Sequence, residues 1–479
     1  MQYDLISLQP VMPEIFMLGA ACLVLVVDLF LSQRTRMWTY GLTLITLVAS
    51  IAITAWAAGP ERQVLFDGSY VRDPVSDVLK IALLTINVFV MVYARDYLVQ
   101  RGIYRGEFYT LALFATLGMM IMASAGNFLT VYLGLELLAL SMYALVAFDR
   151  DSVKGSEAAM KYFVLGALAS GLLLYGMSML YGATGTLNLS AMSEVIAAGE
   201  AEETVLVFGL VFVVIGIAFK FGAVPFHMWV PDVYDGAPTA VTLFLGSAPK
   251  IAAFALAIRL LADGAGGLSV HWSDMLIILA VASLAIGNVV AIAQTNIKRM
   301  LAYSTISHVG FIFLGFVAAD SRGYGAALFY TVVYALTAAG GFGLLTVISR
   351  KGFDAETLED LKGLNDRSPW LAGMMLLILF SMAGVPPTVG FFAKLFVLDA
   401  VVQVDLVWLA VVAVFFSIIG AYYYLRAIKM MYFDKPTDEY PIVASVDSRL
   451  AISINGVAVL LLGIFPAGLL QVCRSAFGG

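Results

Sequence analysis

The chain has 479 residues, of which 61% are hydrophobic and only 13% are charged. Roughly a quarter of the residues in an ordinary soluble domain are charged, so this composition excludes a water-soluble globule. One transmembrane helix takes about 20 apolar residues plus a loop, and the length therefore has room for about ten to fifteen spans. The net charge of −6 argues against nucleic acid as a partner.

The residue inventory also argues against a metal or nucleotide cofactor in this chain. Cys22 and Cys473 lie near opposite ends, so they cannot form a four-thiolate iron–sulfur site or a cysteine-rich zinc site. No two of His227, His271 and His308 have the i, i+3 or i, i+4 spacing of paired ligands on a helix. Neither GxGxxG after a strand-like run nor GxxxxGK[ST] occurs, so nucleotide binding has no support.

Apolar runs between polar breaks predict an all-α polytopic membrane protein with about fourteen transmembrane helices. Acidic Asp4 and Glu14 occupy the place of a basic n-region, so the first run is expected to stay as an anchor. The predicted spans lie near 11–31, 37–58, 73–95, 107–125, 127–148, 160–183, 204–226, 239–262, 275–294, 300–318, 324–349, 369–397, 405–431 and 449–472.

Lysine and arginine are distributed unevenly between the two sides of these spans. Seventeen lie in loops after odd-numbered spans, including Lys298 and Arg299, and five lie on the other side, including Arg259. The positive-inside rule therefore places the odd-numbered loops in the cytoplasm and both termini outside.

Five lysines remain, and all of them fall inside predicted spans. An ionisable group at membrane depth costs a few kcal/mol or more and usually faces a bundle interior or a water-filled path. Burial lowers the pKa of a lysine and a carboxylate raises it, so a small rearrangement can load or unload its proton, which arginine cannot release. The pattern favours protonation chemistry. The five are Lys80, Lys161, Lys220, Lys250 and Lys394.

Two of these lysines have simpler interpretations. Lys161 opens its span, and its side chain could reach the cytoplasmic surface. Lys80 follows Asp77 by three residues, which predicts an ion pair on one helical face. The other three are the candidates for proton transfer.

Two further titratable groups lie at depth. Glu136 has about ten apolar residues on either side and needs a partner, for which an intramembrane lysine is the obvious candidate. The alternative is a neutral carboxyl group hydrogen-bonded to a neighbouring helix. His308 either relays protons or is a hydrogen-bonded core histidine.

Prolines predict two broken helices beside these lysines. Pro225 follows Lys220 by five residues, and Pro386 and Pro387 precede Lys394. Proline removes a backbone donor and clashes with the carbonyl four residues earlier, and carbonyls freed at membrane depth tend to line cavities. The oxygens expected to be freed include those of Phe221 and Met382.

The breaks also predict an internal repeat. Spans four to eight and nine to thirteen each contain five helices, and the broken helix is the fourth of each set. Because five is odd, the second copy enters from the opposite face, which is the inverted repeat of transporters. Lys250, directly after Pro249, lies at the join of the two half-channels. The predicted divisions are 1–106, 107–262, 263–431 and 432–479.

Several stretches carry a family resemblance. KFGAVPFHMWVPDVYDGAPTAVTLFLGSAPK, NFLTVYLGLELLALSMY, KYFVLGALASG, QTNIKRMLAYSTISHVGF and GVPPTVGFFAKLFV resemble the antiporter-like membrane subunits of proton-pumping NADH:quinone oxidoreductase, respiratory complex I. Lysine at 394 and the stretch GSAPK are most similar to the bacterial subunit N type, and the chain ends too soon for the lateral helix of subunit L.

The resemblance implies roles for individual residues. Glu136 would tune Lys220, Lys250 would be the central relay and Lys394 the terminal proton site, with Lys161 and His308 as possible relays. FMN, iron–sulfur clusters and quinone would belong to other subunits. The implied partners are subunit M, small membrane subunits and lipids, in the bacterial inner membrane with both termini in the periplasm.

Two alternatives stay open. A cation/proton antiporter subunit of the Mrp type resembles the same fold and would exchange sodium or potassium without NADH oxidation. A scaffolding subunit would keep pumping after its buried lysines were neutralised.

Overall fold

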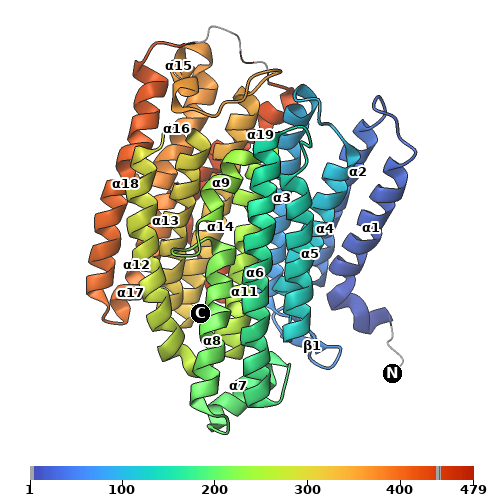
Figure 1. Ribbon diagram of the computed structural model, residues 1–479, viewed down its shortest axis with the longest axis vertical. Helices are drawn as coiled ribbons and strands as arrows, with labels where there is room; N and C mark the ends of the chain where they lie inside the picture. The colour runs from blue at the N-terminus through green and yellow to red at the C-terminus, as the bar shows by residue number, and fades with distance from the viewer. Residues whose placement is uncertain (1–4, 438–441, 443, 479) are drawn as a thin grey trace.

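The computed structural model describes residues 5–437, 442 and 444–478, and its helices pack side by side into one bundle (Figure 1). Within these residues, thirteen helices are long and apolar enough to cross a membrane. The α-helices are α1 (Met12–Asp28), α2 (Met37–Ala57), α3 (Pro74–Gln100), α4 (Gly106–Ala123), α5 (Phe128–Val146), α6 (Val153–Thr184), α7 (Leu189–Ala198), α8 (Glu203–Phe221), α9 (Trp229–Gly236), α10 (Thr239–Gly246), α11 (Ala248–Ala257), α12 (Ser269–Ala293), α13 (Ile297–Val317), α14 (Ser321–Ile348), α15 (Leu364–Arg367), α16 (Pro369–Ala383), α17 (Val389–Gln403), α18 (Val407–Phe433), α19 (Val446–Ile464) and α20 (Pro466–Ser475).

Short elements complete the described chain. Strands β1 (Gln63–Leu65) and β2 (Tyr70–Arg72) form an antiparallel hairpin at one end of the bundle (Figure 1). The short helical turns are η1 (Leu5–Val11), the π-helical η2 (Ile258–Gly264), η3 (Gly266–Leu268) and η4 (Leu358–Leu361).

The predicted all-α membrane fold is confirmed, with one difference in the count. Each predicted span coincides with a helical segment, but the twelfth is split into α16 and α17, each of 15 residues. Neither half meets the length of a span alone, so thirteen spans are found among the described residues where about fourteen crossings were predicted. The eighth span counts as one although Ser247 separates α10 from α11.

Both termini lie at the same end of the bundle. The Tyr70 hydroxyl in β2 donates to the Pro10 carbonyl at 2.7 Å, which fixes the N-terminal segment beside the hairpin. At the other terminus, the Phe477 ring lies 5.7 Å from that of Tyr324, in the first turn of α14. This agrees with an even number of crossings, and the assignment of that end to the periplasm stays a prediction.

The two predicted repeats share a local structure that recurs in opposite orientations. Asn127 caps α5 and forms a β-bridge with Asn188, whereas Asn296 caps α13 and forms a β-bridge with Thr357. The Asn127 bridge lies beside β2, whose Tyr70 pairs with Ala125, and the Asn296 bridge lies at Thr357, directly before η4 and α15. The labels β1 and α15 stand at opposite ends of the bundle (Figure 1). Helices α5 and α13 therefore start from opposite ends, as an inverted repeat requires.

The centre of the bundle is formed by three spans. The apolar windows of Thr239–Gly264, Ile297–Val317 and Ser321–Ile348 are each 94% buried, whereas that of Val407–Phe433 is only 33% buried. Large apolar side chains such as Phe415 and Ile418 of α18 are exposed on the chain alone. In a membrane such surfaces face lipid or neighbouring subunits.

Two basic residues form buried ion pairs that the sequence did not predict. Lys80 binds Glu14 at 2.6 Å instead of Asp77, because Arg72 takes the Asp77 carboxylate, also at 2.6 Å. The predicted Lys80–Asp77 pair is therefore wrong. Tyr70 is a second partner, accepting from Lys80 at 2.9 Å.

Arg259, counted in the sequence as a loop residue, is also buried. Its guanidinium binds both carboxylate oxygens of Asp73 at 2.7 and 2.8 Å and Asp263 at 2.7 Å. It also donates to the Ala123 carbonyl. These contacts join the end of the eighth span to Asp73, which caps the start of α3, and to Ala123, the last residue of α4.

The Arg259→Leu substitution is expected to lower the free energy of unfolding by about 3–5 kcal/mol, because it leaves Asp73 buried and unpaired. The half-buried pair of Arg95 and Asp447 offers a control that water screens more strongly, and Arg95→Leu should cost about 1 kcal/mol or less. Thermal unfolding of the purified protein measures both. Equal shifts in the two variants would contradict the structural role of Arg259.

Candidate functional site

The first predicted helix break is present after α8. The helix ends at Phe221 because Gly222 adopts a left-handed conformation with φ of +78°. The Phe221 carbonyl is left without a helical donor, and the Lys250 ammonium donates to it at 2.8 Å. The prediction that this oxygen would be freed is confirmed, and its partner is one of the predicted lysines.

Lys220 and Lys250 line the same cavity, which has a volume of about 30 Å³. A water molecule needs about 10–15 Å³ of such space, so the cavity has room for about two. Tyr162 and Trp229 form part of its wall, and the Lys250 ammonium lies 5.5 Å from the centre of the Trp229 ring. Lys220 has no hydrogen bond or ion pair to any residue that the structure describes. One or two waters can therefore link two ammonium groups that come from different spans.

Glu136 lies on α5, whose residues Leu135 and Ala139 line this cavity. Among the described residues its carboxylate forms no ion pair, and its buried Oε1 has no hydrogen-bond partner. Lys220, the expected partner, therefore lines the same cavity as the helix of Glu136, but the two side chains are not in direct contact.

The second predicted helix break, after α16, resembles the first. Here the lysine follows the break in the sequence, whereas Lys220 precedes the first break. Helix α16 ends at Ala383 because Gly384 has a φ of +85°, and the Lys394 ammonium donates to the Ala383 carbonyl at 2.8 Å. Ser417 of α18 accepts a second hydrogen bond from Lys394 at 2.9 Å. Lys250 and Lys394 therefore bind the last carbonyl of the helix that each break interrupts.

The carbonyl that binds Lys394 lies one residue after the Met382 carbonyl that was expected to be freed. Met382 was expected to carry the freed oxygen because it lies four residues before Pro386. The acceptor is Ala383, four residues before Pro387. The second proline of the pair is therefore the one equivalent to Pro225.

His308 is buried, and both of its ring nitrogens have partners. Nδ1 lies 2.7 Å from the Tyr330 hydroxyl and Nε2 lies 3.1 Å from that of Tyr424, which also contacts the Ser304 hydroxyl. This is the geometry of a hydrogen-bonded core histidine, and the same contacts connect it to groups that can exchange protons.

Lys161 does not line the cavity that Lys220 and Lys250 share. Its side chain is 43% exposed and pairs with Glu157 and Asp232, each at 2.8 Å. The surface interpretation of this lysine fits these contacts.

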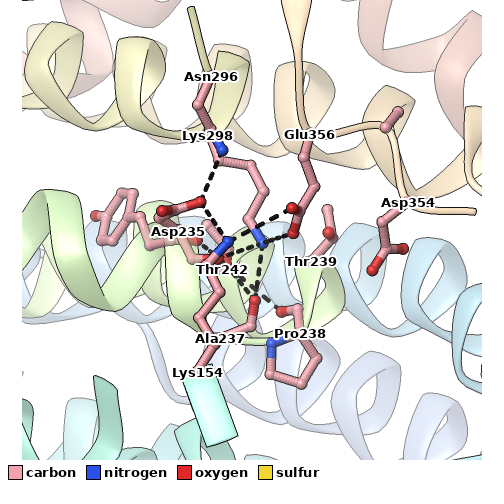
Figure 2. Close-up of polar contacts among 12 residues, drawn as sticks. Lys154, Asp235, Ala237, Pro238, Thr239, Thr242, Asn296, Lys298, Asp354 and Glu356 are labelled. Atoms are coloured by element: carbon pink, nitrogen blue, oxygen red, sulfur yellow. Dashed lines mark hydrogen bonds and ion pairs between the residues drawn. The ribbon is translucent and has the colours of Figure 1, made fainter. Parts of the chain in front are cut away.

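The sequence missed one buried lysine. Lys298 was assigned to a cytoplasmic loop, yet it lies in the first turn of α13 and is 1% exposed. Figure 2 shows its ammonium among Asp235, Ala237 and Glu356. The signal available in the sequence was Asn296, a typical N-cap residue two positions earlier, which starts the helix before the basic pair.

Asp354 lies beside this cluster, in the segment after α14 (Figure 2). Burial raises the pKa of its carboxyl group above the ordinary value, although the charges of Arg101 and Lys298 oppose this shift. Its Oδ2 binds Arg101 at 3.3 Å and accepts from the Tyr97 hydroxyl at 3.2 Å.

Comparison with known proteins gives the context of this arrangement. The model of the family described as NADH:quinone oxidoreductase/Mrp antiporter, TM matches residues 125–420. The chain belongs to this family. It is 60% identical over 477 residues to NADH-quinone oxidoreductase subunit N of Thioalkalivibrio sulfidiphilus, covering 99% of each chain. It is 58% identical to subunit N of Thiobacillus denitrificans, covering 100% of this chain and 99% of the relative.

Solved structures agree with this membership. A chain of respiratory complex I from Thermus thermophilus with bound aureothin is 32% identical, with a TM-score of 0.83 and coverage of 96% of this chain and 98% of that one. A chain of the Mrp complex from a Dietzia species has a TM-score of 0.86 at 22% identity, covering 99% and 97%, which shows a shared fold.

The family resemblance inferred from the sequence is thereby confirmed. Within the described residues, no group of three or more His, Cys, Asp and Glu side chains could hold a metal ion.

Proposed function

We propose that this family member moves protons in NADH-quinone oxidoreductase through Glu136, Lys220, Lys250 and Lys394. The main support is that Lys250 and Lys394 bind equivalent carbonyls at the two breaks, while Lys220 and Lys250 share a cavity with room for water. Buried lysines beside freed carbonyls and water can gain and lose protons without leaving the membrane interior.

The mechanism we propose starts from the separated Glu136 and Lys220. When Glu136 approaches Lys220, its negative charge holds the proton on that lysine; when it withdraws, the proton is released toward Lys250. The cavity supplies the water path for this step. From Lys250 the proton continues to Lys394, with His308 and its two tyrosines as a candidate connection.

The driving force is proposed to come from other subunits. FMN, iron–sulfur clusters and quinone there would carry electrons from NADH, and the resulting charge change would shift Glu136. Subunit M, small membrane subunits and membrane lipids are the proposed neighbours of the exposed apolar helices. In the bacterial inner membrane, the end of the bundle with both termini would face the periplasm.

A Lys220→Ala variant tests this function in sealed membrane vesicles that contain the assembled complex. NADH-driven proton uptake is measured in choline buffer and again with sodium or potassium. We expect uptake without either cation in the parent, and an uptake lower by about tenfold in the variant, because the first relay is lost. Cation-dependent exchange without NADH would favour the Mrp-type alternative. Unchanged uptake per electron in Lys220→Ala would favour the scaffold alternative.

A further inference from the structure

Lys298 uses its ammonium group to hold the end of α9. The Nζ atom donates to the carbonyls of Asp235 at 3.0 Å and Ala237 at 2.9 Å, and it lies 3.5 Å from a Glu356 carboxylate oxygen (Figure 2). Terminal carbonyls of a helix have no internal donors and carry partial negative charge, so a cation is the fitting partner there. The ammonium group of Lys298 therefore contacts two carbonyls at the end of α9 and the Glu356 carboxylate.

The surrounding contacts join the two repeats at this point. Lys154 of α6 binds the Asp235 side chain at 2.9 Å and Glu356 at 3.4 Å. The Asn296 amide donates to the same Asp235 oxygen at 2.7 Å. Glu356 is in turn held in place by its backbone carbonyl, which accepts from the Ile297 amide at 2.8 Å. Figure 2 shows these groups converging from α6, α9, α13 and the segment after α14.

The first residue of α9 lines the cavity that Lys220 and Lys250 share. This helix has eight residues and starts at Trp229, whose indole donates to the Phe219 carbonyl at 3.0 Å. The Trp229 ring stacks on Tyr162 with centres 4.7 Å apart and lies beside the Lys250 ammonium. At 1.5 Å per residue, α9 is only about 12 Å long and connects the Lys298 cluster to the cavity wall as one short rigid element.

We infer that Lys298 is a positioning residue for proton transfer, which acts through α9 to set Trp229 against Lys220 and Lys250. This inference rests on the proposed function of those two lysines. A purely structural role would not require a charge here, because well-packed apolar groups often stabilise a buried site as well as an ion pair does. A displacement of α9 moves the cavity wall, and a shift of about 1 Å is enough to slow a transfer step.

The test compares proton-to-electron ratios in vesicles that contain the assembled complex. We expect Lys298→Met to lower the ratio about twofold or more, while Lys298→Arg, which keeps donors for both carbonyls, retains most of it. Lys362→Met is the control, because the ion-pair partner of Lys362 is Glu359 of η4 instead of a group of α9, and its ratio should equal that of the parent.

A double variant separates positioning from general damage. If Lys298 acts through Trp229, then Lys298→Met combined with Trp229→Phe should be no worse than the poorer single variant. Independent effects that multiply would overturn the inference, as would a parental ratio in Lys298→Met or an equal loss in Lys298→Arg. Should Lys298→Met fail to assemble, Lys298→Gln, whose neutral amide replaces the ammonium that binds both carbonyls, is used in the same comparison, and an unchanged ratio would again overturn the inference.

The Lys220→Ala variant keeps the two claims apart. A normal ratio in Lys220→Ala means that the proposed proton path itself is wrong. A low ratio in Lys220→Ala with a normal ratio in Lys298→Met means that only the positioning role is wrong.

Discussion

Replacing Lys394 with methionine is expected to lower NADH-driven proton uptake by about tenfold in the assembled complex. Methionine keeps the length of an apolar stem but cannot carry a proton. The substitution also removes the donor to the Ala383 carbonyl, whose unsatisfied burial costs about 1–3 kcal/mol, less than needed to unfold a bundle of this size. Assembly should therefore persist while uptake falls.

Ser417→Ala provides the control for this variant. It removes one hydrogen-bond partner of Lys394 and leaves the ammonium and its contact with Ala383 in place. The loss of one such bond is typically worth about 1 kcal/mol, so we expect uptake to fall by about fivefold or less, a smaller fall than in Lys394→Met. If Lys394→Met pumps better than Ser417→Ala, Lys394 is not the terminal proton site.

Lys250→Met is expected to have the second large effect. Lys250 is 1% exposed, lines the same cavity as Lys220 and belongs to one of the three spans at the centre of the bundle. Without its ammonium, a proton released by Lys220 has no adjacent lysine to receive it, and uptake should fall by about tenfold. Proton uptake and NADH oxidation are measured together.

The two activities distinguish loss of coupling from loss of the complex. NADH oxidation by an artificial acceptor that bypasses quinone should stay at the parental level, because the proposed function places the electron carriers of that route in other subunits. A parallel fall in both activities would indicate poor assembly. Unchanged uptake in Lys250→Met would remove the central relay from the account.

Much of this fold was predictable because the bilayer imposes length and polarity on every span. The apolar runs predicted the helices, and the prolines predicted both breaks. The repeat was predictable from the number of helices between those breaks. The halves of the twelfth span could not be bounded so well, since Gly384 ends α16 through a left-handed conformation that a proline pattern alone does not place.

The contacts of the charged residues were less predictable, because they depend on helices that are distant in sequence. Asp77 lies three residues before Lys80, but Lys80 forms its ion pair with Glu14 of α1. Lys298 was interpreted as a loop residue because basic residues commonly mark the cytoplasmic side. Its burial results from the packing of α9 and of the segment around Glu356, which are 58 or more residues away along the chain.

In the candidate site, too, the residues could be predicted from the sequence but their contacts could not. The lysines and Glu136 could be selected because ionisable groups are costly within a span. That Lys220 and Lys250 share one cavity, and that Glu136 stays out of direct contact with Lys220, are properties of the packed bundle.

The most direct test of the account is the proton-to-electron ratio of a Lys250→Arg variant in sealed vesicles. Arginine keeps the positive charge and can donate to the Phe221 carbonyl, but it does not release its proton in proteins. If Lys250 works by gaining and losing a proton, the assembled variant should oxidise NADH with a ratio lowered as far as in Lys250→Met. A ratio equal to that of the parent would show that a fixed charge is sufficient at this position, and it would contradict the lysine relay.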